Sequence, residues 1–591
     1  MSKFSINYVE DLSVDLNSLE KSSASTVEDL NYEYSPYQIS ELKNYNPILG
    51  KFFEMPVNQE NRPYALNHKY HIQDLNTVVD ITTKESLAKD VFVKFSPLLD
   101  PIRYMIGKYR NDQDKLRIMP TFDSTEQCHP KVVDTNNAAY TDSFFSFLTS
   151  KMLHQHGFLH GIDYYGTAIG VQSKYKMNVT DDLEYLNSST YFSENLNKLF
   201  TISDMSEEDN YNNFGSRRNK NRIVIGENTS TNDYDINDEI IALDGIEDIV
   251  GEEIDESNLI PEYVKEEDAD IVSVTSSSSA GSSNNSEINY SSCDEDEVVN
   301  ALLSDDDDDE EEEGDEEQDE EQDEGEEDWQ TESDDSQETE RYAYIKDFPV
   351  QLICLEKCQG TLDELFEKGK LNPELAASAL FQINMILLSY QKSFHFTHND
   401  LHTNNIMYNN TDIENLYYKY KNVVYKVPTY GKLFKLIDFG RSIYRFGGKK
   451  FCSDSFAAGG DAATQYNCEP YLNEKKPRLD PNYSFDLCRL GCSIYDFIMD
   501  EDEPVNVKKL DGLQETIYRW CSDDSGKNVL YKKNGDERYP NFKLYKMIAR
   551  TVHNHTPEAQ LEFPYFKQFA TKEKLDMNHS TIDIDALPVY V

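Results

Sequence analysis

The chain has 591 residues, a formal net charge of -54 and 38% hydrophobic residues. This length allows two to four average domains, or one large domain with insertions and tails. More than half of the excess charge comes from residues 294–340, which contain 29 Asp and Glu and no Lys or Arg. Because such a tract repels a phosphate backbone, we expect no direct nucleic-acid binding.

Cysteine spacing and hydropathy indicate the compartment. The nine cysteines include no C-x-x-C pair and no spacing typical of zinc sites, which favours reduced thiols. The first residues lack the basic and apolar pattern of a signal peptide, and no run of 18 apolar residues occurs. We therefore expect an intracellular protein, cytoplasmic or nuclear, without membrane association.

The first third of the chain is expected to hold a polar tail and then a folded segment. Residues 1–60 are polar with weak periodicity, which is typical of a tail. From residue 61 to 202 apolar residues recur densely. Their patterns predict strands at residues 90–99 and 162–172 and a helix at residues 138–156.

Residues 203–341 differ in composition from both flanks. Asn, Ser and acidic residues dominate, and the segment includes "SDDDDDEEEEGDEEQDEEQDEGEED". A segment with so few apolar groups cannot offset the entropy lost on ordering. We therefore expect a disordered acidic insert, which acts either as a solvated spacer or as a docking segment for basic partners.

Apolar patterns resume at about residue 342. The run "FPVQLICLEKC" (348–358) has the length and composition of a strand. A helix is predicted at residues 371–394, where Asn372 suits the N-cap and Pro373 suits the first helical position.

Three polar residues beyond this helix form a chemically coherent set. Asp400 and Asn405 lie in "HFTHNDLHTNNIMYNN" (395–410), and Asp438 follows the strand-like "KLFKLI". Mg²⁺ prefers hard oxygen ligands, which the Asp438 carboxylate and the Asn405 amide carbonyl provide. Asp400 suits the task of orienting an attacking hydroxyl and accepting its proton. The set predicts a site for a metal-bound triphosphate and a hydroxyl acceptor.

These residues lie in motifs that resemble those of eukaryotic-type protein kinases. "HNDLHTNN" (398–405) is similar to the kinase catalytic loop, "DFG" (438–440) to the metal-binding motif and "FDLCRLGCSIYDF" (485–497) to the buried anchoring helix. "VFVK" (91–94) resembles the third-strand lysine motif, and "LICLEKCQGTLDEL" (352–365) resembles the hinge. The motifs also follow one another in the order found in the family.

The resemblance implies an α+β, two-lobed kinase-like fold that binds ATP and Mg²⁺ between its lobes. It divides the chain as follows: a tail at 1–60, the small lobe at 61–202 and 342–358, the acidic insert at 203–341, the large lobe at 359–575 and a tail at 576–591.

The resemblance also implies roles for single residues. Lys94 would contact the α and β phosphates and pair with a carboxylate, for which Asp142 is the candidate and Glu126 the reserve. The adenine side would be formed by Leu355 as gatekeeper and by the backbone of Glu356 to Cys358. The reacting end would be formed by Asp400 as base, His402 near the γ-phosphate or substrate, and Asn405 and Asp438 as Mg²⁺ ligands.

Several positions depart from the usual family pattern. No G-x-G-x-x-G motif precedes Lys94, Asn399 replaces the usual Arg, and no clear A-P-E motif follows. His402 replaces the usual Lys, as in haspin-like kinases. The chain is also similar to divergent kinases of large DNA viruses, which would place it in an infected host cell.

Other interpretations remain open. His395, His398 and His402 have helical spacing that suits a metal site, but no further Cys or His cluster completes it. We expect an active serine/threonine protein kinase, with a basic protein as a candidate substrate. A pseudokinase that acts as a binding or scaffold module is the alternative, and a small-molecule kinase related to choline kinase is the third.

Overall fold

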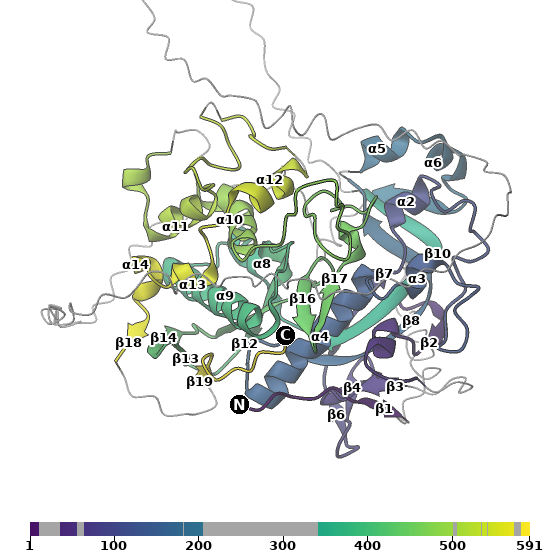
Figure 1. The fold of residues 1–591 in the computed structure, drawn as a ribbon, viewed down its shortest axis with the longest axis horizontal. Coiled ribbons are helices and arrows are strands. Elements are labelled where there is room, and N and C mark those ends of the chain that lie inside the picture. Colours follow the sequence, from purple (N-terminus) through teal and green to yellow (C-terminus); the bar gives the residue numbers. More distant parts are fainter. Residues whose placement is uncertain are drawn as a thin grey trace, which may run out of the picture. The chain divides into compact units, whose positions relative to one another are not determined.

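A computed structural model of the chain describes residues 1–10, 36–55, 64–180, 182–204, 341–499, 505–533, 535–540, 542–572 and 581–591. The predicted disordered insert lies outside these residues except at its edges, where residues 203, 204 and 341 belong to strands. The described residues form a mixed α+β fold with several sheets (Figure 1). Among them, no helix is long and apolar enough to cross a membrane.

The largest sheet has five strands. They run in the order β2–β8–β10–β7, and β9 pairs with the first residues of β10. Their bounds are Ile39–Lys43 (β2), Val91–Pro97 (β7), Tyr164–Asn178 (β8), Phe200–Asp204 (β9) and Arg341–Glu356 (β10). The three predicted strands thus appear as β7, β8 and β10, and all the pairings are antiparallel.

One long helix, α4 (Ala138–His156), is buried against this sheet. Its N-cap is Asn137, and Gly157 ends it in the left-handed conformation with φ 65°. Ser143 on α4 accepts a hydrogen bond of 3.1 Å from Gln351 on β10. The opposite side of α4 packs on a hairpin, with 5.0 Å between the ring centroids of Phe144 and Phe451. The helix is therefore buried on several faces, and the sequence prediction for residues 138–156 is confirmed.

The helices α8 to α14 lie together around α9 (Pro373–Phe394) (Figure 1). Asn372 caps α9 by accepting from the backbone N–H of Leu375 at 2.8 Å, and Pro373 occupies the first turn, as predicted. The other helices in this group are α8 (Leu362–Glu367), α10 (Phe485–Ile498), α11 (Gly512–Trp520), α12 (Lys543–Thr551), α13 (Pro557–Gln560) and α14 (Pro564–Lys567).

Three smaller sheets are formed by strands between residues 360 and 583. One has the order β11–β12–β15, another the order β18–β14–β13–β19, and β16 pairs with β17. The strands are β11 (Gly360–Thr361), β12 (Ile406–Asn410), β13 (Asn415–Tyr420), β14 (Val423–Pro428), β15 (Lys432–Leu436), β16 (Ile443–Phe446), β17 (Lys449–Cys452), β18 (Ala570–Thr571) and β19 (Thr581–Asp583).

The remaining elements are short strands and helices. Two further sheets have the orders β1–β3 and β4–β5–β6. The elements are β1 (Tyr8–Glu10), η1 (Pro47–Lys51), β3 (Tyr64–Leu66), β4 (Tyr70–Asp74), β5 (Thr77–Asp80), β6 (Ser86–Ala88), α2 (Pro101–Met105), α3 (Pro130–Val133), α5 (Leu183–Asn187), α6 (Thr190–Asn195), η5 (Thr403–Asn405), η6 (Asp454–Phe456) and η7 (Val507–Lys509).

Both segments that were expected to be tails contain residues that pack on the fold. In residues 36–55, β2 pairs with β8, and Ile48 is fully buried. In residues 581–591, β19 pairs with β13, and the Tyr590 hydroxyl accepts from the backbone N–H of Phe4 at 3.1 Å. The two ends of the chain therefore lie side by side (Figure 1).

Candidate active site

Two neighbouring strands bring Asn405 and Asp438 together. Asn405 immediately precedes β12 and Asp438 lies just beyond β15. These strands are antiparallel, with Ile406 opposite Leu436, and the Ile437 amide donates to the Asn405 carbonyl at 3.1 Å. The register therefore places two predicted metal ligands at the same edge of the small sheet.

Lys94 links β7 to this edge. Its ammonium group lies 2.6 Å from Asp142 Oδ2 on α4 and 2.7 Å from Asp438 Oδ1. Asp142 Oδ1 also accepts from the backbone N–H of Phe439 at 3.0 Å. Of the two carboxylates considered for Lys94, Asp142 is thus the one that contacts it, while Glu126 is exposed to solvent.

The charges in this cluster stabilise one another. Burial disfavours the Lys94 cation, but Asp142 and Asp438 outweigh it and raise the Lys94 pKa above its ordinary value. Burial also opposes ionisation of Asp438, and Lys94 nevertheless lowers the pKa of that carboxyl. Lys94 is therefore a permanent cation, and Asp438 is a carboxylate at neutral pH.

Asp400 has a hydrogen-bond partner for one carboxylate oxygen and an ion-pair partner for the other. Tyr545, on α12, donates its hydroxyl to Oδ1 at 2.8 Å, and Arg441 Nη1 lies 3.3 Å from Oδ2. Burial raises the Asp400 pKa, but Arg441, His402, Arg489 and the Tyr545 hydroxyl together hold it well below its ordinary value. Asp400 is thus ionised throughout the physiological pH range.

A second arginine completes the surroundings of Asp400. Arg489, on α10, donates from Nε to the Tyr545 hydroxyl oxygen at 2.8 Å, and its guanidinium lies 5.0 Å from the centroid of the Tyr545 ring. Its Nη1 is buried and has no hydrogen-bond partner. Arg441 is also paired with Asp461 at 2.5 Å. Two cations therefore flank the predicted base.

The backbone before Asp400 is fixed by a buried carboxylate. Asp486, in the first turn of α10, accepts from the backbone N–H groups of His398 at 2.9 Å and Asn399 at 2.8 Å. Asn399 has φ 64°, and its side chain accepts from the Tyr466 hydroxyl at 2.8 Å. Asn is one of the residues that tolerate this left-handed conformation, so the loop shape suits Asn399.

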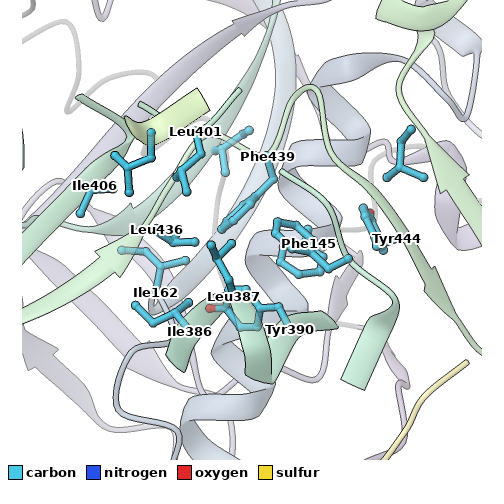
Figure 2. Close-up of a cluster of buried hydrophobic side chains, with 14 of the residues drawn as sticks. Phe145, Ile162, Ile386, Leu387, Tyr390, Leu401, Ile406, Leu436, Phe439 and Tyr444 are labelled. Atoms are coloured by element: carbon cyan, nitrogen blue, oxygen red, sulfur yellow. The ribbon is translucent and has the colours of Figure 1, made fainter. Parts of the chain in front are cut away.

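A buried apolar cluster includes Leu401 of the 398–405 loop. Figure 2 shows Leu401 and Phe439 of the two predicted loops beside Phe145 of α4 and Leu387 of α9. Phe145 and Phe439 ring centroids are 4.7 Å apart, and both side chains are almost fully buried. Packing of this kind fixes side chains in single conformations, so the neighbouring polar groups of the 398–405 loop and of Asp438 are held in place.

His402 is half-buried and neutral. Burial outweighs the attraction of Asp400 and lowers the His402 pKa to about 4. Its Nε2 lies 3.0 Å from the Asn405 amide nitrogen, which also donates to the Asp400 carbonyl at 2.9 Å. His402 thus acts as a hydrogen-bond acceptor for Asn405 and does not supply a cation at neutral pH.

The Asn405 side-chain oxygen fits a role as a metal ligand. Its amide group is oriented by two hydrogen bonds, and Oδ1 is buried without a hydrogen-bond partner. An unsatisfied buried acceptor costs free energy unless a ligand satisfies it. Oxygen atoms of Asn405 and Asp438 suit Mg²⁺, which binds few protein ligands and completes its shell with water and phosphate oxygens.

The predicted hinge residues lie at the end of β10. Leu355 is buried, and the backbone N–H of Glu356 donates to the Asp163 carbonyl at 2.9 Å. The Glu356 side chain accepts from the backbone N–H of Asp163 at 2.7 Å, and it pairs with Lys435 at 2.5 Å. The backbone N–H and the side chain of Glu356 are thus engaged within the fold, and burial raises the pKa of the nearby Cys358 thiol to about 12.

The three histidines of residues 395–402 have separate environments. His395 is exposed, His398 Nε2 bonds the Ile437 carbonyl at 2.9 Å, and His402 faces Asn405. Within the described ranges, no group of three or more His, Cys, Asp or Glu is arranged to hold a metal ion. A three-histidine metal site therefore has no support in this geometry.

Four residues at the site were not identified from the sequence as site residues. Arg441 follows the D-F-G motif directly, so its position near the site was available from the motif. Asp486 and Arg489 lie within the segment 485–497 that resembles the anchoring helix, but no contact with Asp400 was assigned to them, and Tyr545 on α12 lies outside every motif. Their contribution depends on helix packing, which a single sequence does not specify.

No protein-family model matches the chain, and no curated protein matches it significantly. Function must therefore be inferred from the site itself.

Proposed function

We propose that the chain is an ATP-dependent protein kinase of serine/threonine type that transfers the γ-phosphate of ATP to protein hydroxyls. The observation that carries the proposal is the cluster of Lys94, Asp142 and Asp438 beside Asn405 and Asp400. Five residues from four chain segments lie together there, and residues of these types suit the handling of a metal-bound triphosphate.

The arrangement of the elements supports a divergent, two-lobed kinase fold. The large sheet with α4 would form the small lobe, and the helices around α9 would form the large lobe. β10 is the last strand of this sheet in chain order, and the chain continues from it through residues 357–359 to β11 and α8. The order of Lys94, α4, β10, the 398–405 loop, Asp438 and α10 is the order of the motifs in the family.

Each residue would have a distinct role in phosphoryl transfer. Lys94 would contact the phosphates, held in place by Asp142, and Asp400 would orient the acceptor hydroxyl and take its proton. Mg²⁺, held by Asn405 and Asp438, would neutralise charge on the phosphates. His402, being neutral, would position Asn405 and would not bind the γ-phosphate.

A pseudokinase is the second candidate, and two observations favour it. β7 is an edge strand of the large sheet. Within the described part of the chain no further strand pairs with its free edge, so none there would cover phosphates bound beside Lys94. In addition, both oxygens of Asp400 are engaged by Tyr545 and Arg441. A scaffold that retains the fold without turnover would share these properties.

The test compares Asp400→Asn with the unaltered chain. Asn keeps the shape of the side chain but cannot accept the proton, so kcat should fall on the order of 10²- to 10⁴-fold while Mg·ATP affinity stays within a few-fold. Radiolabel transfer and a thermal-shift titration with Mg·ATP measure the two quantities.

Two controls complete this test. Asp461→Asn removes a carboxylate from the same Arg441 without changing Asp400, and it should retain most activity. Asp438→Ala should abolish metal-dependent nucleotide binding. Full transfer by Asp400→Asn would contradict the proposed role, and ATP binding without transfer in the unaltered chain would favour the pseudokinase.

A further inference from the structure

We propose that Tyr545 is a site of intramolecular autophosphorylation. This inference rests on the proposed function, because it uses the same base and the same ATP. The acceptor here is a tyrosine that the fold itself holds on Asp400, so its choice is separate from the serine/threonine preference proposed for added protein substrates. It adds a modification site on α12, far in sequence from every motif considered above.

The geometry places an acceptor hydroxyl on the predicted base. The Tyr545 oxygen lies 2.8 Å from Asp400 Oδ1, within the range required for proton transfer between an acceptor and a general base. Burial raises the Tyr545 pKa, so the phenol is protonated at neutral pH and donates to the carboxylate. The hydroxyl therefore already makes the contact with the predicted base that an acceptor hydroxyl needs.

The reaction balances without any further reactant. The phenol oxygen would attack the γ-phosphorus of ATP, forming a new P–O bond, while the bond between that phosphorus and the β–γ bridging oxygen breaks. ADP is the leaving group, and the phenol proton passes to Asp400, which later releases it to water. Because the acceptor is part of the same chain, no encounter with a second protein is required.

The surroundings suit the product as well as the reactant. Phosphotyrosine carries close to two negative charges, and these would be repelled by the Asp400 carboxylate. Arg489 lies against the same ring, and its buried Nη1 has no partner, so it offers a free donor to the phosphate. The modification would thus move the Tyr545 side chain from Asp400 towards Arg489 and free Asp400 for other acceptors.

Position, and not exposure, would select this tyrosine. Tyr430, in the turn between β14 and β15, is 50% exposed. An unspecific modification would favour such exposed tyrosines. The intramolecular reaction should favour Tyr545, which gives a matched comparison within one chain.

The experiment uses the full chain, first treated with phosphatase and then incubated with Mg·ATP. Sites are mapped by mass spectrometry over a tenfold range of protein concentration. We expect phosphate on Tyr545 with a first-order rate constant that is unchanged by dilution, and none on Tyr430. Tyr545→Phe should lose this phosphopeptide, whereas Tyr430→Phe should retain it.

A second arm separates reaction within a chain from reaction between chains. Isotopically labelled Asp438→Ala protein, which cannot react itself, is mixed with unlabelled active protein. Its Tyr545 should stay unmodified, and modification there would overturn the intramolecular reaction.

The outcomes distinguish the two proposals. Phosphate on an added protein or on other residues, with Tyr545 unmodified, would overturn this inference and leave the proposed function intact. No transfer to any residue or added protein would overturn the proposed function, and the inference with it.

Discussion

At the scale of single residues, the site combines paired charges with buried polar atoms that have no partner. Lys94 pairs with both Asp142 and Asp438, whereas the Asn405 side-chain oxygen, the acceptor beside them, is buried without a partner. This contrast separates groups that hold the site together from a group that awaits a ligand. The free acceptor is therefore the sharpest indication of a metal at this position.

A pH prediction follows from His402. Its pKa of about 4 means that the ring is neutral above pH 5 and that its Nε2 accepts from Asn405. Protonation near pH 4 would remove this acceptor, so any contribution of His402 to activity is lost only as the pH falls through that value. We therefore expect kcat/KM to show no ionisation of His402 between pH 5.5 and 8.

The measurement is a pH profile of kcat/KM for the unaltered chain and for His402→Gln. The Gln carbonyl can still accept from Asn405, so the two profiles should have the same shape. A limb centred near pH 6.5 that disappears in His402→Gln would contradict the assignment of a neutral ring.

The sequence identified the residues that carry chemistry but only part of their environment. Asp400, Asn405 and Asp438 belong to short motifs, and the structure brings all three to one edge. Tyr545 lies outside every motif, and the contact of Arg489 with Tyr545 could not be found in this way although Arg489 lies within the motif at 485–497, because these contacts depend on how α10 and α12 pack. Local spacing contains no information on such long-range packing.

At the scale of elements, periodic segments were predictable and irregular ones were not. The spacing of apolar residues and the capping residues located α4 and α9 to within two residues of their observed bounds. β10 starts at Arg341, seven residues before the apolar run that was recognised as a strand. Its early residues are held by pairing with β8 and β9, and pairing partners cannot be read from a single segment.

A buried ion pair couples β10 to β15 next to the predicted hinge. Lys435 and Glu356 are 2.5 Å apart, and their side chains are only 4% and 17% exposed. Lys435 also donates to the Gly161 carbonyl at 2.8 Å. Removal of one member of a buried pair leaves an uncompensated charge, which typically costs about 3–5 kcal/mol.

We therefore expect Lys435→Met to lower the free energy of unfolding by about 3 kcal/mol, at the low end because Glu356 keeps two other donors. Addition of Glu356→Gln should recover part of this loss, because the buried charge is then gone. Denaturant titration measures both variants.

An exposed pair supplies the control for this prediction. Lys368 and Glu364 on α8 lie 2.8 Å apart, and Lys368 is 47% exposed. Lys368→Met should cost less than about 1 kcal/mol, because exposed ion pairs contribute little. Equal losses for Lys435→Met and Lys368→Met would contradict the special role of the buried pair.

At the scale of the whole molecule, the long acidic segment enters and leaves the fold at one place. Asp204 ends β9 and Arg341 begins β10, and the two residues are directly opposite in an antiparallel pair. The segment at residues 205–340 is thus a long connection between two adjacent strand ends. Composition alone predicted an insert here, but only the strand pairing shows that its two ends meet.

This pairing predicts that the fold does not require the insert. A two-residue Asn-Gly turn is sufficient to join adjacent antiparallel strand ends, so it can replace residues 205–340. We expect the shortened chain to keep the melting temperature of the folded part within a few degrees. Its kcat/KM towards an uncharged peptide should stay within about twofold, because the contacts of the candidate site in the described part of the chain are made by residues outside the segment. Calorimetry and peptide phosphorylation assays measure both quantities.

A matched variant in which a neutral Gly-Ser linker of the same length replaces the segment separates the effect of length from the effect of charge. Loss of the fold or of peptide phosphorylation in both variants would show that the segment contributes to the folded unit. Loss confined to a basic protein substrate, and suppressed at high salt, would instead assign the segment an electrostatic docking role.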